Sequence, residues 1–367
     1  MKKIEDIEKL RGLACILVFI QHMVWICPFV FLSDVLPKAF QHGSGGVAIF
    51  FAISGFVITL SLRDKLANVV GDTFLERVRS STATISLFYK KRFLRVMPVM
   101  LTVWCVLGIF FLCSEKDANW LIPFLRVPFE VVSGIYPYIV ENFVEYGKVH
   151  LYGMGPFWTL AVEIQFYIAW PIVMLLCKND NIRAIVSLLC GALFLIVVQP
   201  LAIGFYGFKY YALYNNIPAL FFGSFFAMIF DAKKEYNVKN KLAVIFGMLA
   251  SFIAVWCFNS ILPEENFFTH TIEAIFAILM LVLAVFANGK FEIPVITKIL
   301  LFLGRRSYSF YAVQLTAATI VTWFIHSIYF PIKNSTPFLQ FIVLLVVLSL
   351  VTEIVYNCIE KPSRKWG

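Results

Sequence analysis

The sequence predicts an all-α integral membrane protein with about ten transmembrane helices and with both termini in the cytoplasm. Three observations predict this fold class: the composition, the recurrence of apolar segments along the chain, and the placement of the basic residues. Of the 367 residues, 60% are hydrophobic and 14% are charged, whereas soluble domains have about 25% charged residues. The mean hydropathy is +0.83. No long polar stretch interrupts the pattern, so residues 1–367 are expected to form a single membrane domain.

Ten apolar segments are long enough to cross a hydrocarbon core of about 30 Å as helices, several of them close to the lower length limit. They fall at residues 10–31, 46–62, 97–113, 156–177, 183–203, 213–230, 241–258, 271–287, 306–328 and 338–359. The first is too long for the core of a cleavable signal peptide, so it is expected to be a retained signal anchor. Residues 120–140 are also apolar, but two prolines and two charges interrupt them, and we expect an interfacial or re-entrant loop there.

The basic residues support this order of spans. If the N-terminus is placed in the cytoplasm and the spans alternate, 25 of the 31 Lys and Arg residues fall on the cytoplasmic side. This asymmetry is the positive-inside bias of multi-pass membrane proteins. The net charge of +9 comes from an excess of basic residues, and the predicted topology places that excess on the cytoplasmic side. Anionic lipid or an anionic ligand could meet this surface, whereas nothing else in the sequence points to nucleic acid. The predicted location is the plasma membrane.

Metal and disulfide chemistry are not expected. The eight cysteines are scattered through apolar runs without a CxxC pair, and we interpret them as small buried apolar residues. The five histidines form no HExxH or other metal-ligand spacing.

The first span, LRGLACILVFIQH, carries Arg11 at one end and His22 at the other. On a helix their spacing puts them on one face, separated by roughly 16 Å along the axis. Arg11 would lie at the cytoplasmic surface and His22 near the middle of the membrane, where a titratable side chain is costly. The imidazole could serve helix packing alone, or it could act as a general base near pH 7.

Glu163 lies in the segment GPFWTLAVEIQFYIAWP, which enters the membrane from the outside with Trp158 at the interfacial level. Its expected depth differs from that of His22 by only about 5 Å, so the two side chains could meet. A His–Glu pair would orient the imidazole and stabilise its protonated form. The alternative is a carboxylate that pairs with an Arg or Tyr and locks two helices together.

Three arginines are expected at one level of the membrane. Arg92 and Arg95, in YKKRFLRVMPVM, share a helix face because they are three residues apart, and Arg11 lies at the same level on the first span. Basic residues commonly anchor the cytoplasmic ends of helices. Three guanidinium groups at one height could also bind a polyphosphate through bidentate contacts.

Two further segments place small or polar residues inside spans. In HGSGGVAIFFAISGF, residues 42–56, the glycines permit either close helix packing or a broken helix beside a cavity. In GRRSYSFYAVQLT, Tyr308, Tyr311 and Gln314 recur every three residues and form a polar stripe that is expected to face the interior of the bundle.

Taken in order, these segments resemble the membrane acyltransferase-3 family of O-antigen and exopolysaccharide acetyltransferases. LRGLACILVFIQH is similar to its R-x10-H signature, and over nearly the whole chain it is followed in the family's order by GGVAIFFAISGF, KRFLRVMP, FWTLAVEIQFY, GRRSYSFY and IEKPSRKW. The resemblance implies a bacterial inner-membrane protein that moves an acyl group, commonly acetyl, from cytoplasmic acyl-CoA to a hydroxyl of a cell-envelope or exported glycan. The partners it implies are membrane lipid, acyl-CoA and a carbohydrate or lipid-linked glycan acceptor.

The resemblance also implies roles for individual residues. Arg11, Arg92 and Arg95 would hold the phosphates of CoA. His22 would remove the proton of the acceptor hydroxyl, and Glu163 would support the imidazolium. The substrate path would be lined by Tyr308, Tyr311, Gln314 and Trp158.

The sequence departs from the family at one position. Many members carry a His a few residues after the S-Y-S-x-Y stretch, where this chain has Gln314, which can hydrogen-bond but cannot accept a proton. The family's optional extracytoplasmic esterase-like domain is not expected. Two other functions therefore stay open: a proton-coupled transporter with His22 and Glu163 as its relay, and a noncatalytic family member.

Overall fold

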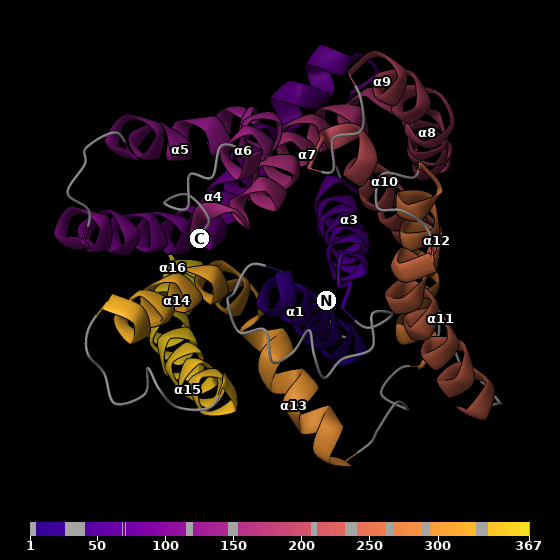
Figure 1. Ribbon diagram of the computed structural model, residues 1–367. Coiled ribbons are helices and arrows are strands. Elements are labelled where there is room, and N and C mark those ends of the chain that lie inside the picture. Colours follow the sequence, from indigo (N-terminus) through magenta and orange to yellow (C-terminus); the bar gives the residue numbers. More distant parts are fainter. Residues whose placement is uncertain are drawn as a thin grey trace.

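A computed structural model describes residues 5–25, 41–67, 69, 71–114, 120–145, 153–206, 211–231, 241–261, 267–287, 294–327 and 337–366. All regular elements within these ranges are helices, which confirms the predicted all-α class. Figure 1 shows α1 (Glu5–Trp25) and α3 (Gly45–Leu66) in the middle of the bundle, with the other helices arranged around them.

Seven stretches of the described chain are long and apolar enough to cross a membrane. They lie in α3, α4 (Phe74–Ser114), α7 (Phe157–Leu176), the run from α8 (Asp180–Leu193) through η4 (Phe194–Val198) to α9 (Gln199–Tyr206), α12 (Phe267–Ala287), α14 (Ser307–Ser327), and the run from α15 (Pro337–Val355) through η5 (Tyr356–Glu360) to α16 (Lys361–Lys365). The other three predicted spans are also helical over their described residues, but α10 (Leu213–Ile229) and α11 (Lys241–Ile261) have shorter apolar stretches, and α1 begins with charged residues.

The stretch 120–140 is helical, so the predicted interfacial or re-entrant loop is wrong. It forms α5 (Leu121–Ser133) and the start of α6 (Tyr136–Glu145), and α5 packs on α7. Pro123 lies in the first turn of α5, where its missing N–H has no intrahelical acceptor in any case. Gly134, with φ of +80°, ends α5 in the left-handed conformation that glycine adopts readily.

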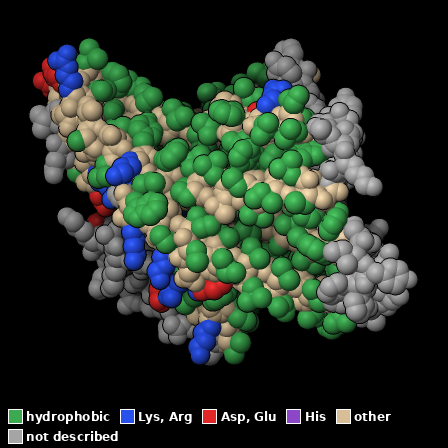
Figure 2. All heavy atoms as spheres, turned by 90° about the vertical axis from the view of Figure 1, so that its left-hand side faces the viewer, with side chains coloured by type: hydrophobic (Ala, Val, Ile, Leu, Met, Phe, Trp, Pro, Cys, Tyr) green, Lys and Arg blue, Asp and Glu red, His purple; other side chains and the backbone are tan. Residues whose placement is uncertain are grey.

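The charged side chains are gathered mainly along one edge of the face shown in Figure 2, and hydrophobic side chains cover most of the rest. Large apolar side chains on α4 and α8, such as Ile109, Leu112 and Leu189, are more than 60% exposed. An apolar surface of this extent fits a surrounding hydrocarbon phase rather than water. Cys105, Cys113 and Cys358 are exposed, so the interpretation of the cysteines as buried residues is wrong for these three.

Glycines let the central helices pack with their backbones in contact. A Cβ atom on Gly55 of α3 would lie 2.0 Å from the carbonyl oxygen of Leu220 on α10, and one on Gly223 would lie 2.2 Å from that of Ala52. The helix α3 is continuous from residue 45 to residue 66. The glycine-rich segment therefore serves close packing, and no break in the helix occurs within it.

The amphipathic helix α13 (Pro294–Arg305) packs along α1 in the same way. A Cβ on Gly304 would lie 1.8 Å from the carbonyl oxygen of Glu8, and one on Gly12 would lie 2.1 Å from that of Leu300. These contacts fix the position of the first turns of α1, which include Arg11.

Candidate functional site

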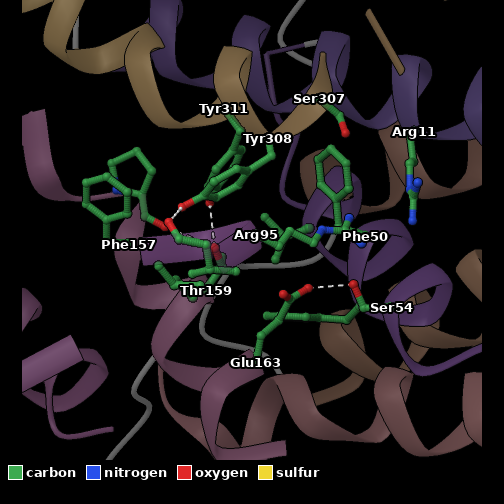
Figure 3. Close-up of a pocket in the computed structure, with 15 residues that line it drawn as sticks. Arg11, Phe50, Ser54, Arg95, Phe157, Thr159, Glu163, Ser307, Tyr308 and Tyr311 are labelled. Carbon is green, nitrogen blue, oxygen red and sulfur yellow. Dashed lines mark hydrogen bonds between the residues drawn. The ribbon is translucent and has the colours of Figure 1, made fainter. Parts of the chain in front are cut away.

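A cavity between α1, α3, α4, α7 and α14 collects most of the predicted site residues. Its volume is about 80 Å³, which is room for roughly five to eight water molecules or for one small group. Its lining residues are Arg11, Val47, Phe50, Phe51, Ser54, Arg95, Val96, Pro156, Phe157, Thr159, Leu160, Glu163, Ser307, Tyr308 and Tyr311. Figure 3 shows Arg95 reaching between the tyrosines of α14 and the carboxylate of α7.

Glu163 is held in this cavity by hydroxyl groups from two helices. The Ser54 hydroxyl of α3 donates a hydrogen bond to its Oε1 at 2.5 Å (Figure 3). The Tyr167 hydroxyl, one turn along α7, donates to its Oε2. The two donors fix the positions of both carboxylate oxygens. The predicted contact with His22 is not formed in the described part of the chain. The alternative, an Arg or Tyr partner that locks two helices together, is met only in part: the tyrosine partner lies on α7 itself, and Ser54 supplies the link to α3.

Two of the three predicted arginines line the same cavity. Arg11 comes from α1 and forms an ion pair with Glu8 one turn earlier, at 3.2 Å. Arg95 comes from α4, and its guanidinium has electrostatic interactions with Glu163 and Tyr167. The predicted common level of Arg11 and Arg95 therefore agrees with their meeting in one cavity.

Arg92 lies one turn before Arg95 on α4 and is outside the lining. Its guanidinium is over the rings of Phe88 and Tyr167, at 5.2 and 5.6 Å from their centroids. These cation–π contacts orient the side chain while leaving its N–H groups free to meet an acceptor in the plane of the guanidinium. Arg92 also interacts electrostatically with Arg95 and Glu163, so it belongs to the same charged group.

Tyr308 and Tyr311 reach the cavity from the first turns of α14, as their spacing predicts. The Tyr308 hydroxyl donates to the carbonyl oxygen of Val96 at 2.6 Å, next to Pro98 in α4. Pro98 removes one backbone donor from this part of the helix. The Tyr311 hydroxyl is 3.2 Å from Oγ1 of Thr159 on α7 (Figure 3). The two tyrosines thus tie α14 to α4 and to α7.

His22 and Gln314 lie together, outside the lining of this cavity. The imidazole of His22 interacts with the side chain of Gln314, which is 0% exposed and whose Nε2 also donates to the carbonyl oxygen of Tyr311 at 3.3 Å. The amide that replaces the family's second histidine is therefore the side chain beside the predicted base.

The ring of Trp158 is buried, whereas a Trp in an interfacial belt would have its ring at the surface of the bundle. Trp158 is 4% exposed and packs against Phe51 and Tyr211, with ring centroids at 6.1 and 5.1 Å. It does not line the cavity, although its neighbours Phe157 and Thr159 do. Trp158 therefore supports the packing of α7 on α3 from the side.

The sequence prediction missed several members of the site. Ser54 lies in the glycine-rich segment 42–56, whose pattern indicates close packing or a broken helix and gives no sign of a carboxylate partner. The i+4 spacing of Tyr167 from Glu163 places both on one helix face and is the signal that could have identified Tyr167. At the C-terminal end of the chain, Arg364 forms an ion pair with Glu360 and interacts electrostatically with Arg95. The segment IEKPSRKW contains both residues, but it lies at the end of the last predicted span, and its sequence gives no indication of how close it lies to the other arginines.

A second, larger cavity of about 390 Å³ lies between the first half of α4 and the end of α7. Its lining is apolar except for hydroxyl groups, including those of Ser81, Thr82 and Tyr89, and it contains no charged side chain. Charge therefore distinguishes the smaller cavity as the candidate site. Among the described residues, no group of three or more His, Cys, Asp or Glu side chains could hold a metal ion.

Comparison with known proteins gives matches over most of the chain. O-acetyltransferase OatA of Staphylococcus aureus strain NCTC 8325 / PS 47 is 26% identical over 341 residues, which is 88% of this chain and 53% of the relative. "Putative O-acetyltransferase SACOL0978" of strain COL is 24% identical over 391 residues, which is 100% of this chain and 58% of the relative. The chain thus spans about half the length of the curated relatives it matches. No solved structure matches it.

A family model described as an acyltransferase domain matches residues 4–356. The match includes the first arginine, the cavity and the two tyrosines of α14, and it ends just before Glu360 and Arg364. It agrees with the family resemblance of the sequence motifs, and it covers nearly the whole chain. The chain belongs to this acyltransferase family.

Proposed function

We propose that the chain is an integral membrane O-acyltransferase that moves an acyl group, acetyl in the first instance, from acyl-CoA to a hydroxyl of a cell-envelope or exported glycan. The observation that carries the proposal is the cavity in which Arg11 and Arg95 meet Glu163 and the hydroxyls of α14, inside a family member. Two relatives that are named as O-acetyltransferases support the choice of acetyl and of an oxygen acceptor.

The donor fits the charge and the size of the site. Guanidinium groups bind phosphates through paired N–H donors; Arg11 and Arg95 supply them in the cavity, and Arg92 supplies them beside Arg95. A volume of about 80 Å³ is small against the whole of acyl-CoA but large enough for its acyl end. We therefore place the phosphates at the arginines and the thioester within the bundle. The bias of Lys and Arg residues supports a cytoplasmic position for this end, and we place the protein in a bacterial inner membrane.

The proton transfer is assigned to His22 with Gln314 as its partner. Gln314 Oε1 and His22 Nδ1 are both buried without a hydrogen-bond partner in the structure. If the amide turned so that its oxygen accepted one imidazole N–H, the other ring nitrogen would keep its lone pair and could accept a proton. An amide does this in some nucleophilic sites in place of a carboxylate. His22 would take the proton from the acceptor hydroxyl as its oxygen attacks the thioester carbonyl, and the departing CoA thiolate would take that proton back.

Glu163 has a different role in this proposal from the one first expected. Its carboxylate faces Arg95, and Ser54 and Tyr167 hold both of its oxygens. It therefore keeps Arg95 oriented and balances part of the positive charge when no donor is bound. Tyr308, Tyr311 and Thr159 add the hydroxyl groups that would surround the acyl group.

The test is acetyl transfer by purified protein in detergent. Radiolabelled acetyl-CoA is the donor, and glycans extracted from the cell envelope are the acceptors. Wild type should release CoA and label the glycan, whereas His22→Ala should abolish labelling and Gln314→Ala should slow it by about tenfold or more. His42→Ala, which removes a histidine that does not line the cavity, is the matched control and should transfer normally.

The outcomes separate the competing functions. Normal transfer by His22→Ala would contradict the assigned base. Substrate uptake into vesicles without any consumption of acetyl-CoA by wild type would favour a proton-coupled transporter. Absence of both activities, with a cellular phenotype that His22→Ala restores as well as wild type does, would indicate a noncatalytic family member.

A further inference from the structure

The last helix of the chain lies against the arginine-bearing part of α4. The short helix α16 contacts α4, and Figure 1 shows it close to α14. Its Arg364 interacts electrostatically with Arg11, Arg92 and Arg95, which come from α1 and α4. Arg364 is thus a fourth guanidinium in the group that contains the three predicted ones.

A buried carboxylate fixes the position of Arg364. Glu360 is 0% exposed, and its Oε2 accepts hydrogen bonds from the Ser309 backbone N–H, at 3.1 Å, and from the Ser309 hydroxyl. Its Oε1 contacts the guanidinium of Arg364, whose side chain is still 37% exposed. The contact engages Nη2, so other N–H groups of the fork remain for a second acceptor. Glu360 therefore links Arg364 to Ser309 of α14, while the guanidinium side chain stays partly exposed.

The carboxylates around these four arginines are already engaged. Glu8 is 3.2 Å from Arg11, Glu163 accepts bonds from two hydroxyls, and Glu360 is bound by Ser309 and Arg364. Four guanidiniums face three carboxylates, and Lys65 and Lys91 add two positive charges beside Arg92. Like charges held at close range repel one another, and a bound polyanion relieves that repulsion.

We infer that Arg364 binds a phosphate of the acyl-CoA donor, so that α16 forms one wall of the donor site. The inference rests on the proposed function, and it adds a binding residue from the end of the chain to those from α1 and α4. The same chemistry would suit an anionic lipid headgroup. The two sources can be distinguished because CoA carries a 3′-phosphate and a pyrophosphate, whereas the headgroup of phosphatidylglycerol carries a single phosphodiester. The 3′-phosphate can be removed separately by using 3′-dephospho-CoA.

The experiment measures acetyl-CoA binding to the full chain in neutral detergent by calorimetry. Wild type is measured first, because failure of wild type to bind would reject the proposed donor itself. Arg364→Gln should weaken binding by about tenfold or more, the usual loss for one charge-assisted hydrogen bond. Arg79→Gln, which removes an exposed arginine from the early part of α4, is the matched control and should bind as wild type does.

Two further variants separate phosphate binding from the ion pair. Glu360→Gln removes one negative charge but also the carboxylate that positions Arg364, so it should still bind acetyl-CoA more tightly than Arg364→Gln does. Glu360→Gln with Arg364→Gln should bind as weakly as Arg364→Gln alone. If the double variant recovers wild-type affinity, Arg364 serves only to neutralise Glu360, and the inference is overturned while the proposed function stands.

The source of the phosphate is tested by two probes. The loss in Arg364→Gln should become smaller with 3′-dephospho-CoA if Arg364 contacts the 3′-phosphate, and should stay the same if it contacts the pyrophosphate. Unchanged acetyl-CoA affinity in Arg364→Gln, together with weaker binding of the protein to phosphatidylglycerol in nanodiscs, would assign the residue to lipid and overturn the inference.

Discussion

Gly55→Ala perturbs the close backbone contact between Gly55 of α3 and Leu220 of α10. The neighbouring residue, Ser54, donates the hydrogen bond to Glu163. The new Cβ would lie 2.0 Å from the Leu220 carbonyl oxygen and 2.8 Å from its carbon. Carbon and oxygen atoms in proteins approach to about 3.3 Å, so the helices must move apart by more than about 1 Å. Both atoms belong to backbone, which no rotamer change can move. Overpacking of this kind costs about 1–3 kcal/mol.

The assay is thermal unfolding in detergent, combined with acetyl-CoA binding. For a chain of 367 residues the loss corresponds to a melting temperature lower by about 1–4 °C. The displacement also shifts Ser54, so donor affinity should fall with stability. Gly204→Ala is the matched control, because nothing lies within 4 Å of its new Cβ, and the change should be neutral or stabilising by up to about 1 kcal/mol. A melting temperature for Gly55→Ala equal to or above that of wild type would refute the close-packing argument.

Two other predictions concern hydrogen bonds that position the helices of the site. Arg183, 7% exposed, donates from Nε to the carbonyl oxygen of Met174 at 3.0 Å, so Arg183→Met should lower the free energy of unfolding by about 1–3 kcal/mol; an unchanged urea midpoint would contradict this. Tyr308→Phe removes the 2.6 Å bond to Val96 and should cost about 0.5–1.5 kcal/mol. A larger loss in thermal melts would show that the Tyr308 hydroxyl does more than join α14 to α4.

The sequence predicted which residues share a depth in the membrane but not which of them face one another. Arg11 and Arg95 meet in one cavity because helix rise and the basic ends of spans determine depth. Glu163 contacts Ser54 and Tyr167 instead of His22 because the contact depends on the rotation of each helix about its axis, which tertiary packing sets. The glycine contacts that fix this rotation pair residues far apart in the sequence.

Other differences have local causes. The start of α1 is helical and buried although it is rich in charges, because Lys9 pairs with Asp6 at 2.8 Å and Arg11 pairs with Glu8. Prolines suggested a loop at 120–140, yet Pro123 lies in the first turn of α5, and the Phe124 carbonyl that Pro128 leaves without a helical donor accepts from Trp104 Nε1 at 3.0 Å. Trp158 is of a residue type that is common in interfacial belts, but its side chain is buried because other helices surround this part of α7.

The central claim is that the protein is an acyltransferase in which arginines bind the donor and a separate histidine takes part in the chemical step. Acetyl-CoA binding to the purified protein tests this claim most directly. Wild type is compared with Arg11→Ala and His22→Ala, with unfolding melts to show that each variant is folded. The account predicts binding by wild type, weaker binding by about tenfold or more in Arg11→Ala, and unchanged binding in His22→Ala. Absence of binding by folded wild type, or equal binding by wild type and Arg11→Ala, would contradict it.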